Sequence, residues 1–370
     1  MYCYHQHCKS VVVREFGGYE SLMVEDLILP SLDGKIEVLV KYGGLNFADL
    51  YTRQGLMVDK PLPFILGMEC TGIITAIGPN LRNTDFKVGQ AVVCYDHNGG
   101  MFRTKVRVEP TKCFPLPDFI NFKIGAAVFV NYITAYFSLI SQGNLKEGET
   151  VLILSCTGGV GCAATQIAKL LVKDVKVFGV GSKVKENQAL QNGVDVFFSR
   201  ETFFEDVTKY KFDVILTNEA GSTFSFLQAC LKPLGRIILI GANEVVQNEH
   251  RLSTFTLLKM WWNTKYIIPS SLIENNRVVA GLHLGTLLEQ NRTKIEAVLD
   301  IIWDNIREGK LKPIIDSVWP MDDIITATKQ LAERKNVGKV IIEIENLGLI
   351  NVKNVFYCAK RGRKFLFKSQ

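Results

Sequence analysis

Two kinds of hydrophobic pattern divide the chain into an N-terminal and a central part. Before about residue 128, short runs alternate apolar and polar positions between glycine and proline turns, as in residues 36–44 (IEVLVKYGG), 71–78 (TGIITAIG) and 89–95 (GQAVVCY). Such alternation with closely spaced turns is typical of antiparallel strands. We therefore expect a largely antiparallel, barrel-like β-domain over residues 10–127.

After residue 150 the pattern changes to continuous apolar runs separated by stretches with helical periodicity. The apolar runs are residues 151–155, 175–180, 194–198, 212–217, 236–241 and 277–285. Between them, residues 165–172, 186–193 and 224–235 have apolar positions at helical spacing. Strands that alternate with helices form βαβ units, so this part predicts an α/β domain with a doubly wound parallel sheet over residues 128–285.

The last part of the chain returns to mixed patterning. It predicts an amphipathic helix near residues 294–309, a strand near 314–320, a helix over 322–335 and a strand at 338–344. We expect this block, residues 286–346, to rejoin the first domain. Residues 347–370 have neither period, and we expect a disordered tail.

Composition and charge narrow the class of protein. The 370 residues are 47% hydrophobic, enough for two cores, and the nine cysteines form no CxxC pair, which favours a reducing, cytoplasmic location. The net charge of +6 comes from the tail: its last twenty residues hold six of the 43 basic residues and no acid, and the remaining 37 equal the acidic count. A neutral body argues against nucleic-acid binding, whereas the basic tail could contact anionic membranes peripherally.

The stretch between Lys123 and Lys146 has no charged residue and is long enough to span a membrane. It contains many polar residues, among them Asn131, Thr134 and Gln142. We therefore expect a buried helix that leads into the second domain.

A glycine-rich turn follows the first apolar run of the α/β domain. Residues 156–161 read CTGGVG, with Gly158, Gly159, Val160 and Gly161 at the start of a helix. A strand, a glycine turn and a helix N-terminus together form a dinucleotide-binding loop, because backbone N–H groups and the helix dipole face the pyrophosphate. Cys156 replaces the first glycine of the motif. An ordinary strand–helix turn is the alternative.

The end of the next strand indicates which dinucleotide would bind. An NAD site has an acidic residue there for the ribose hydroxyls, but this chain reads GSKVK over residues 181–185. Ser182 and Lys185 suit a 2′-phosphate, so we expect NADPH as cofactor. A solvated, lysine-rich helix start is the alternative interpretation.

Longer motifs carry a family resemblance. GLNFADLYTRQG (44–55), PFILGMECTGII (63–74), NYITAYFSLI (131–140) and the GGVG loop occur in an order that resembles the zinc-independent quinone oxidoreductase branch of the medium-chain dehydrogenase/reductase family. WWN, GLHLG, IIDSVWP and KNVGKV resemble, more narrowly, the synaptic vesicle membrane protein (vesicle amine transport protein) group of that branch. The resemblance implies a GroES-like β-barrel domain plus a Rossmann domain, with the active site in the cleft between them, and a homodimer.

The resemblance also implies a site without zinc. The zinc-dependent branch has a Cys near the position of Asn46 and a His where this chain has Met68. Neither residue supplies the N or S ligand that a catalytic zinc needs. Cys94 and Cys113 are the only cysteines near the position of the family's structural zinc lobe, and the N-terminal group Cys3, His5, His7 and Cys8 matches no zinc pattern.

The resemblance assigns roles to individual residues. Asn46 and Tyr51 would face the substrate, with the Tyr51 hydroxyl bonding the acceptor oxygen; packing in the cleft is the alternative for Tyr51. The remaining residues expected to bind the cofactor are Thr134, Gly241, Asn243, His283 and Leu284. A structural role for His283 is an equal alternative. Glu219, at the end of the fourth Rossmann strand, is unusual and could repel phosphate.

These observations favour an NADPH-dependent, zinc-free reductase that transfers hydride to a quinone or an α,β-unsaturated carbonyl. The alternative is a membrane-associated trafficking or organelle-regulating protein that retains the cofactor-binding fold with little activity. Likeness of fold alone does not decide between them.

Overall fold

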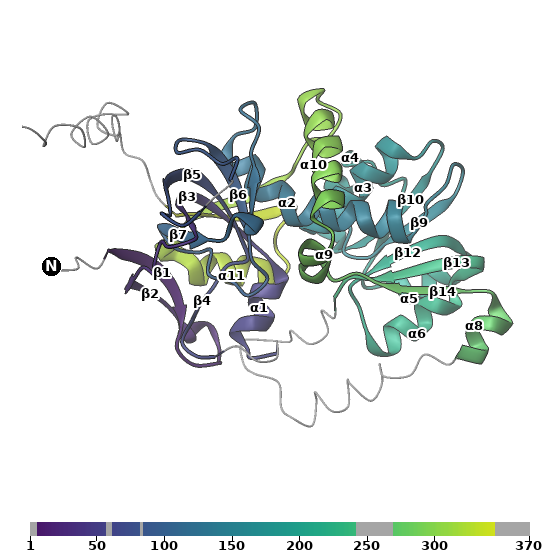
Figure 1. Ribbon diagram of the computed structural model, residues 1–370. Helices are drawn as coiled ribbons and strands as arrows, with labels where there is room; N and C mark the ends of the chain where they lie inside the picture. The colour runs from purple at the N-terminus through teal and green to yellow at the C-terminus, as the bar shows by residue number, and fades with distance from the viewer. Residues whose placement is uncertain (1–5, 57–60, 82–83, 242–268, 345–370) are drawn as a thin grey trace, which may run out of the picture.

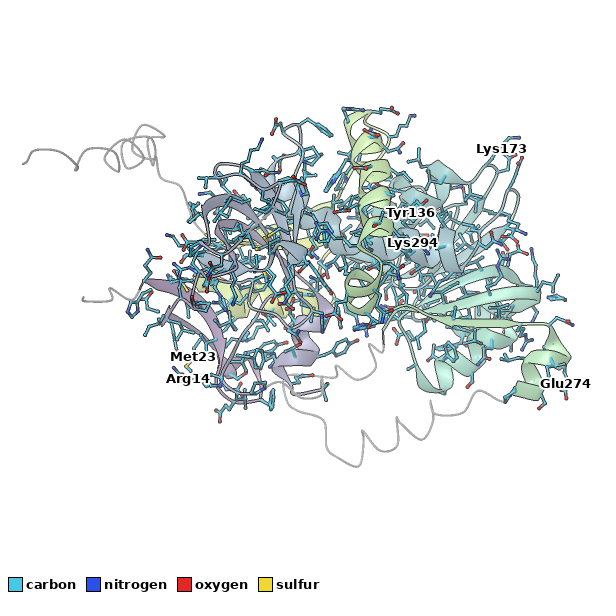
Figure 2. All side chains as sticks on the ribbon, viewed as in Figure 1. Arg14, Met23, Tyr136, Lys173, Glu274 and Lys294 are labelled. Atoms are coloured by element: carbon cyan, nitrogen blue, oxygen red, sulfur yellow. The ribbon has the colours of Figure 1, made fainter. Side chains whose placement is uncertain are left out.

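The computed structural model describes residues 6–56, 61–81, 84–241 and 269–344 and has two lobes, one rich in antiparallel strands and one built on a parallel sheet (Figure 1). Helices α9 (Leu284–Gln290) and α10 (Arg292–Arg307) stand where the lobes meet (Figure 1). Figure 2 shows Arg14 and Met23 at the outer end of the first lobe and Glu274 at the far end of the second. Asn243, Cys3, His5 and the tail lie outside the described residues.

The first lobe contains two sheets. The larger has the order β15-β16-β3-β5-β6-β8, with β7 paired to β3, and the smaller has the order β2-β1-β4. Their strands are β1 (His7–Val13), β2 (Leu22–Ile28), β3 (Ile36–Leu45), β4 (Phe64–Ile65), β5 (Glu69–Ile77), β6 (Ala91–Tyr95), β7 (Lys105–Val108), β8 (Cys113–Pro115), β15 (Ile315–Pro320) and β16 (Lys339–Glu343). Helices α1 (Phe47–Arg53) and α11 (Ile324–Ala332) complete this lobe.

Pairing between β16 and β3 brings the C-terminal block back to the first lobe. The two strands are antiparallel, with Val340 opposite Leu45 and Glu343 opposite Tyr42. Val340 and Ile342 are buried in the same cluster as Val38 and Val40 of β3. Alternating side chains that enter one core hold the register of such a pair.

The second lobe has a six-stranded, all-parallel sheet of order β11-β10-β9-β12-β13-β14. Its strands are β9 (Thr150–Ile153), β10 (Lys176–Gly181), β11 (Val196–Ser199), β12 (Phe212–Thr217), β13 (Leu231–Leu239) and β14 (Val278–Gly281), and its helices are α3 (Gly159–Leu171), α4 (Glu186–Gln191), α5 (Phe203–Asp206), α6 (Gly221–Ala229) and α8 (Pro269–Asn275). Numbered from β9, this is the 3-2-1-4-5-6 order of a Rossmann fold. The predicted fold class is confirmed.

One local prediction was wrong. The helical spacing of residues 224–235 predicted a single helix, but α6 ends at Ala229 and β13 begins at Leu231. Leu231 pairs with Phe212, and the register shifts before Arg236 pairs with Val214. Pro233 cannot continue a helix, and Leu234 has a left-handed φ of 65°, so this segment is an irregular strand.

Helix α2 (Phe122–Tyr136) joins the lobes and continues as a π-helical turn over Phe137–Gln142. The segment Phe122–Gln142 is long and apolar enough to cross a membrane by length and composition, yet most of its apolar stretch is buried inside the protein. Its residues share one core cluster with β9, α3 and the apolar face of α10. It is the buried helix that the sequence predicted.

Candidate active site

A cavity of about 300 Å³ lies between the lobes. It is lined by the segments that follow β9 and β12, where the strand order of the parallel sheet reverses. Ligands of open α/β sheets bind at this switch point. The predicted site residues within the described ranges all line it: Asn46, Tyr51, Thr134, Gly158, Gly159, Val160, Gly161, Ser182, Lys185, Gly241, His283 and Leu284.

The loop between β9 and α3 packs as tightly as its glycines allow. A Cβ on Gly161 would lie 2.2 Å from the Ser155 carbonyl oxygen, and one on Gly159 would lie 2.4 Å from Asn131 Nδ2. At Gly158 the nearest atom would be the Ser155 oxygen at 3.3 Å. The backbone therefore excludes a side chain at Gly161, and a side chain at Gly159 would displace the Asn131 amide. Gly158 meets only the Ser155 oxygen, in a tight contact, and lines the cavity.

Cys156 fits this loop because the neighbouring strand makes room for it. A Cβ on Gly179 of β10 would lie 2.7 Å from Cys156 Sγ, and one on Gly181 would lie 3.7 Å from it. Burial, with Cys162 nearby, raises the pKa of Cys156 to about 12. The side chain is therefore a neutral, apolar filler at neutral pH, and the backbone strain at this turn falls on Ser155, which has a φ of 54°.

Asn46 is the N-cap residue of helix α1, and its side chain is fully occupied by protein groups. Its Nδ2 donates to Gly44 O at 3.0 Å and to Glu69 Oε1 at 2.8 Å, and its Oδ1 accepts from Lys339 Nζ at 2.6 Å. The backbone N–H of Asn46 donates to Asp49 Oδ2 at 2.9 Å. Both amide protons are used, so Asn46 shapes the cavity wall with a fixed orientation.

Glu69 and Lys339 form a buried ion pair behind Asn46. Lys339 Nζ lies 2.5 Å from Glu69 Oε1, and their side chains are 2% and 0% exposed. The second carboxylate oxygen of Glu69 accepts from Val130 N at 3.1 Å. A buried carboxylate needs such partners to stay ionised. The ammonium of Lys339 supplies the positive charge at this position.

Tyr51 reaches across the cleft from helix α1. A Cβ on Gly241, just after β13, would lie 3.8 Å from the Tyr51 hydroxyl oxygen and 3.9 Å from Asn218 Cβ. This end of the cavity therefore has groups from both lobes. Thr134, from the buried helix α2, also lines the cavity.

His283 has a structural role in addition to its place on the cavity wall. Its Nδ1 accepts from Thr286 N at 3.2 Å and so caps helix α9. Across the cleft, His97 packs against Gly285 and its Nδ1 lies 3.3 Å from Glu289 Oε1. These contacts join the loop after β6 to the start of α9.

Lys185 joins the two lobes rather than facing solvent. Its Nζ donates to the carbonyl oxygens of Arg334 at 2.5 Å and Asn336 at 2.7 Å. The same segment of the first lobe donates from Gly338 N to Thr157 O at 2.9 Å. Two of the three ammonium protons are therefore engaged, and the alternative of a solvated, lysine-rich turn does not hold for Lys185, which is 8% exposed.

Among the polar residues of the cavity wall that the sequence interpretation did not assign to the site are Arg200, Asn218 and Arg334. Arg200 follows β11, and the carboxyl end of β11 lies beside that of β10 because the two strands are parallel neighbours. The predicted parallel sheet could therefore have indicated Arg200 as a site residue. Arg334 enters from the first lobe, and nothing local in the sequence indicates this. Asn218 Oδ1 is buried and has no hydrogen-bond partner within the described part of the chain.

Comparisons with known proteins agree with this architecture. The chain matches the family "Alcohol dehydrogenase GroES-like domain" over residues 32–118 and the family "Zinc-binding dehydrogenase" over residues 192–342. It is 36% identical over 345 residues to the synaptic vesicle membrane protein VAT-1 homolog of Danio rerio, covering 91% of this chain and 70% of that protein. The chain belongs to the medium-chain dehydrogenase/reductase family.

Two solved structures of this family resemble the fold over almost their whole length. The human synaptic vesicle membrane protein VAT-1 homolog-like protein has a TM-score of 0.77 at 30% identity, with 92% of this chain and 99% of that chain covered. The quinone oxidoreductase of Escherichia coli, complexed with NADPH, has a TM-score of 0.78 at 24% identity, with 90% and 99% covered. At that identity the second likeness shows the fold alone.

The description "Zinc-binding dehydrogenase" raises the question whether this chain has a group of side chains that could bind zinc. Among the described residues, no group of three His, Cys, Asp or Glu side chains could hold a metal ion. Cys94 and Cys113 have their sulfurs 3.7 Å apart in the barrel core. Hydrogen bonding to Cys94 and burial raise the pKa of Cys113 well above its usual value. Both thiols are 0% exposed.

Proposed function

We propose that this protein is an NADPH-dependent, zinc-free oxidoreductase that reduces a quinone or an α,β-unsaturated carbonyl. The observation that carries the proposal is the make-up of the cavity at the switch point. Its wall has the cations Lys185, Arg200 and Arg334 and also Tyr51, which lies beside Gly241. This combination fits a phosphorylated cofactor together with an acceptor whose oxygen takes a hydrogen bond.

The residues present fit a phosphorylated dinucleotide. Gly158 lines the cavity at the N-terminus of α3, where N–H groups and the helix dipole favour phosphate. Ser182, Lys185 and Arg200 come from the ends of β10 and β11 and would hold the 2′-phosphate. The unpartnered Asn218 Oδ1 would accept from a ribose hydroxyl.

Bound NADPH supplies a hydride to the acceptor. The chain's own contribution is to orient the acceptor and to stabilise the charge that develops on its oxygen. Tyr51 would donate a hydrogen bond to that oxygen, and Asn46, locked by Glu69 and Lys339, would keep helix α1 and hence Tyr51 in place. The catalytic zinc of the family's zinc-dependent branch would have no role in this site. Lys339 already supplies a positive charge next to the Glu69 carboxylate.

A second function is supported by the relatives' names. The Danio rerio and human relatives are called synaptic vesicle membrane proteins, so a membrane-associated protein that binds NADPH with little turnover is the alternative. The basic tail that would contact a membrane lies outside the described residues. The homodimer and the cytoplasmic location stay predictions.

Turnover distinguishes the two functions. The purified protein is mixed with NADPH and, separately, with each of a small panel of quinones and enones, and the loss of reduced-nicotinamide absorbance is followed. The reductase proposal expects acceptor-dependent oxidation of NADPH. NADPH binding without oxidation by any acceptor would favour the second function, and absence of NADPH binding would contradict both.

A further inference from the structure

Glu219 is the acidic side chain that ion-pairs with two arginines of the cavity wall, Arg200 and Arg334. Its Oε1 lies 3.8 Å from Arg200 Nη1 and 3.6 Å from Arg334 Nη1. The carboxylate is more buried than either partner, with 12% of its side chain exposed against 42% and 35%. One carboxylate thus faces two guanidinium groups from different lobes.

Neither contact is a hydrogen bond. Both distances exceed the 2.7–2.9 Å that is typical of a charge-assisted N–H···O bond. Arg200 instead donates from Nη2 to Ser155 Oγ at 3.3 Å, at the start of the glycine loop. A guanidinium has five N–H donors, so both arginines keep donors for another anion.

Three cations, Lys185, Arg200 and Arg334, line this part of the cavity. Glu219 pairs with the two arginines, Glu201 also attracts Arg200, and Asp316 attracts Lys185, but neither Glu201 nor Asp316 lines the cavity. Burial, and next the charge of Arg334, lower the pKa of Arg200, in keeping with repulsion between two guanidinium groups that flank the same Glu219 carboxylate. A second anion at the cavity wall would relieve this repulsion. A phosphate monoester carries about −1.5 to −2 charges at neutral pH and three acceptor oxygens.

We propose that Glu219 is a selectivity-determining residue that competes with the 2′-phosphate of NADPH for Arg200 and Arg334. The inference rests on the proposed function. The phosphate takes the arginine donors that Glu219 leaves unused, but the Glu219 carboxylate repels it from behind the same arginines. NADH has no 2′-phosphate and does not experience this repulsion. Glu219 therefore weakens NADPH binding more than NADH binding. It reduces the ratio by which the protein binds NADPH more tightly than NADH.

The test is a titration of NADPH and NADH against the wild-type protein and Glu219→Gln. Glutamine keeps the size of the side chain and one oxygen acceptor but removes the charge. Since two unit charges still interact at this range in a partly screened site, we expect NADPH affinity to rise about fivefold or more at low salt, with NADH affinity changing less than about twofold. Raising the salt to about 0.5 M should shrink the gain.

Two further variants control the experiment. Glu274→Gln makes the same change in net charge at the far end of the second lobe, where Glu274 is exposed (Figure 2), and should leave both affinities unchanged. Glu219→Ser removes the same charge but introduces a smaller side chain. It replaces Glu219→Gln in the titration if Glu219→Gln has a lowered melting temperature.

The outcomes separate this inference from the proposed function. If wild-type protein binds NADPH and neither Glu219 variant binds it more tightly, the inference is wrong. Weaker NADPH binding in both variants, with their melting temperatures unchanged, would make Glu219 a residue that positions the arginines and would also overturn it. Failure of the wild-type protein to bind NADPH would overturn the proposed function, and the inference with it.

Discussion

Lys339 Nζ lies 2.6 Å from Asn46 Oδ1, so a lysine near the end of the described chain fixes the N-cap residue of helix α1. The same ammonium pairs with Glu69 at 2.5 Å. Three segments that are far apart in sequence are thereby held at one point of the cavity wall. We propose that this point also sets the orientation of Tyr51, which lies on the helix that Asn46 caps.

Lys339→Met should destabilise the fold by about 3–5 kcal/mol, because it leaves the buried Glu69 carboxylate without its counter-charge. Chemical denaturation followed by circular dichroism measures this. Lys335→Met is the matched control, since the Lys335 side chain is 64% exposed and an exposed pair contributes at most about 1 kcal/mol. The double variant with Glu69→Gln should recover part of the loss. Equal stabilities of the two single variants would show that the buried pair has no such role.

Lys185→Met should lower both the melting temperature and the NADPH affinity. The ammonium bonds two carbonyl oxygens of the first lobe, and we assign its remaining donor to the phosphate. Lys183→Met is the control, because Lys183 is exposed and pairs with Glu186. A lowered melting temperature with NADPH affinity unchanged would limit Lys185 to joining the lobes. Lost affinity with an unchanged melting temperature would contradict its structural role.

Tyr51→Phe should lower kcat with the best acceptor while leaving the NADPH dissociation constant within about twofold of wild type. One hydrogen bond to a developing oxyanion is worth on the order of 2–4 kcal/mol, or roughly one and a half to three decades in kcat. Steady-state kinetics and a separate cofactor titration give the two numbers. An unchanged kcat would return Tyr51 to a packing role.

Elemental analysis of the dialysed protein should find far less than one zinc per chain. The reason is chemical: Asn46 and Met68 stand where the family's zinc-dependent branch has ligands, and Lys339 places a positive charge beside Glu69. Roughly one tightly held zinc per chain would contradict the zinc-free site and would direct attention to the residues outside the described ranges.

The sequence predicted the parallel sheet and the glycine loop because both depend on local patterns. Continuous apolar runs between helical stretches specify βαβ units, and CTGGVG follows the first of them. The irregular strand at Leu231 was not predicted, because its apolar residues also fit helical spacing. Only the pairing of Leu231 with Phe212 distinguishes a strand from a helix at this position.

Contacts between the lobes could not be predicted in this way. The neighbours of Lys185 in the sequence indicated a phosphate ligand, but they gave no sign that its ammonium also donates to the carbonyl oxygens of Arg334 and Asn336. Similarly, Glu219 was recognised as unusual, yet the two arginines beside it come from a different strand and a different lobe. Local sequence specifies an element, whereas these partners depend on how two lobes pack.

The measurement that tests the central claim most directly is a titration of the purified protein with NADPH and NADH under identical conditions, followed by nicotinamide fluorescence. The account predicts saturable binding of both at one site, with NADPH tighter by at least about tenfold, because a phosphate that pairs with Lys185, Arg200 and Arg334 gains charge-assisted hydrogen bonds. Equal affinities, tighter NADH, or no saturable NADPH binding would contradict it.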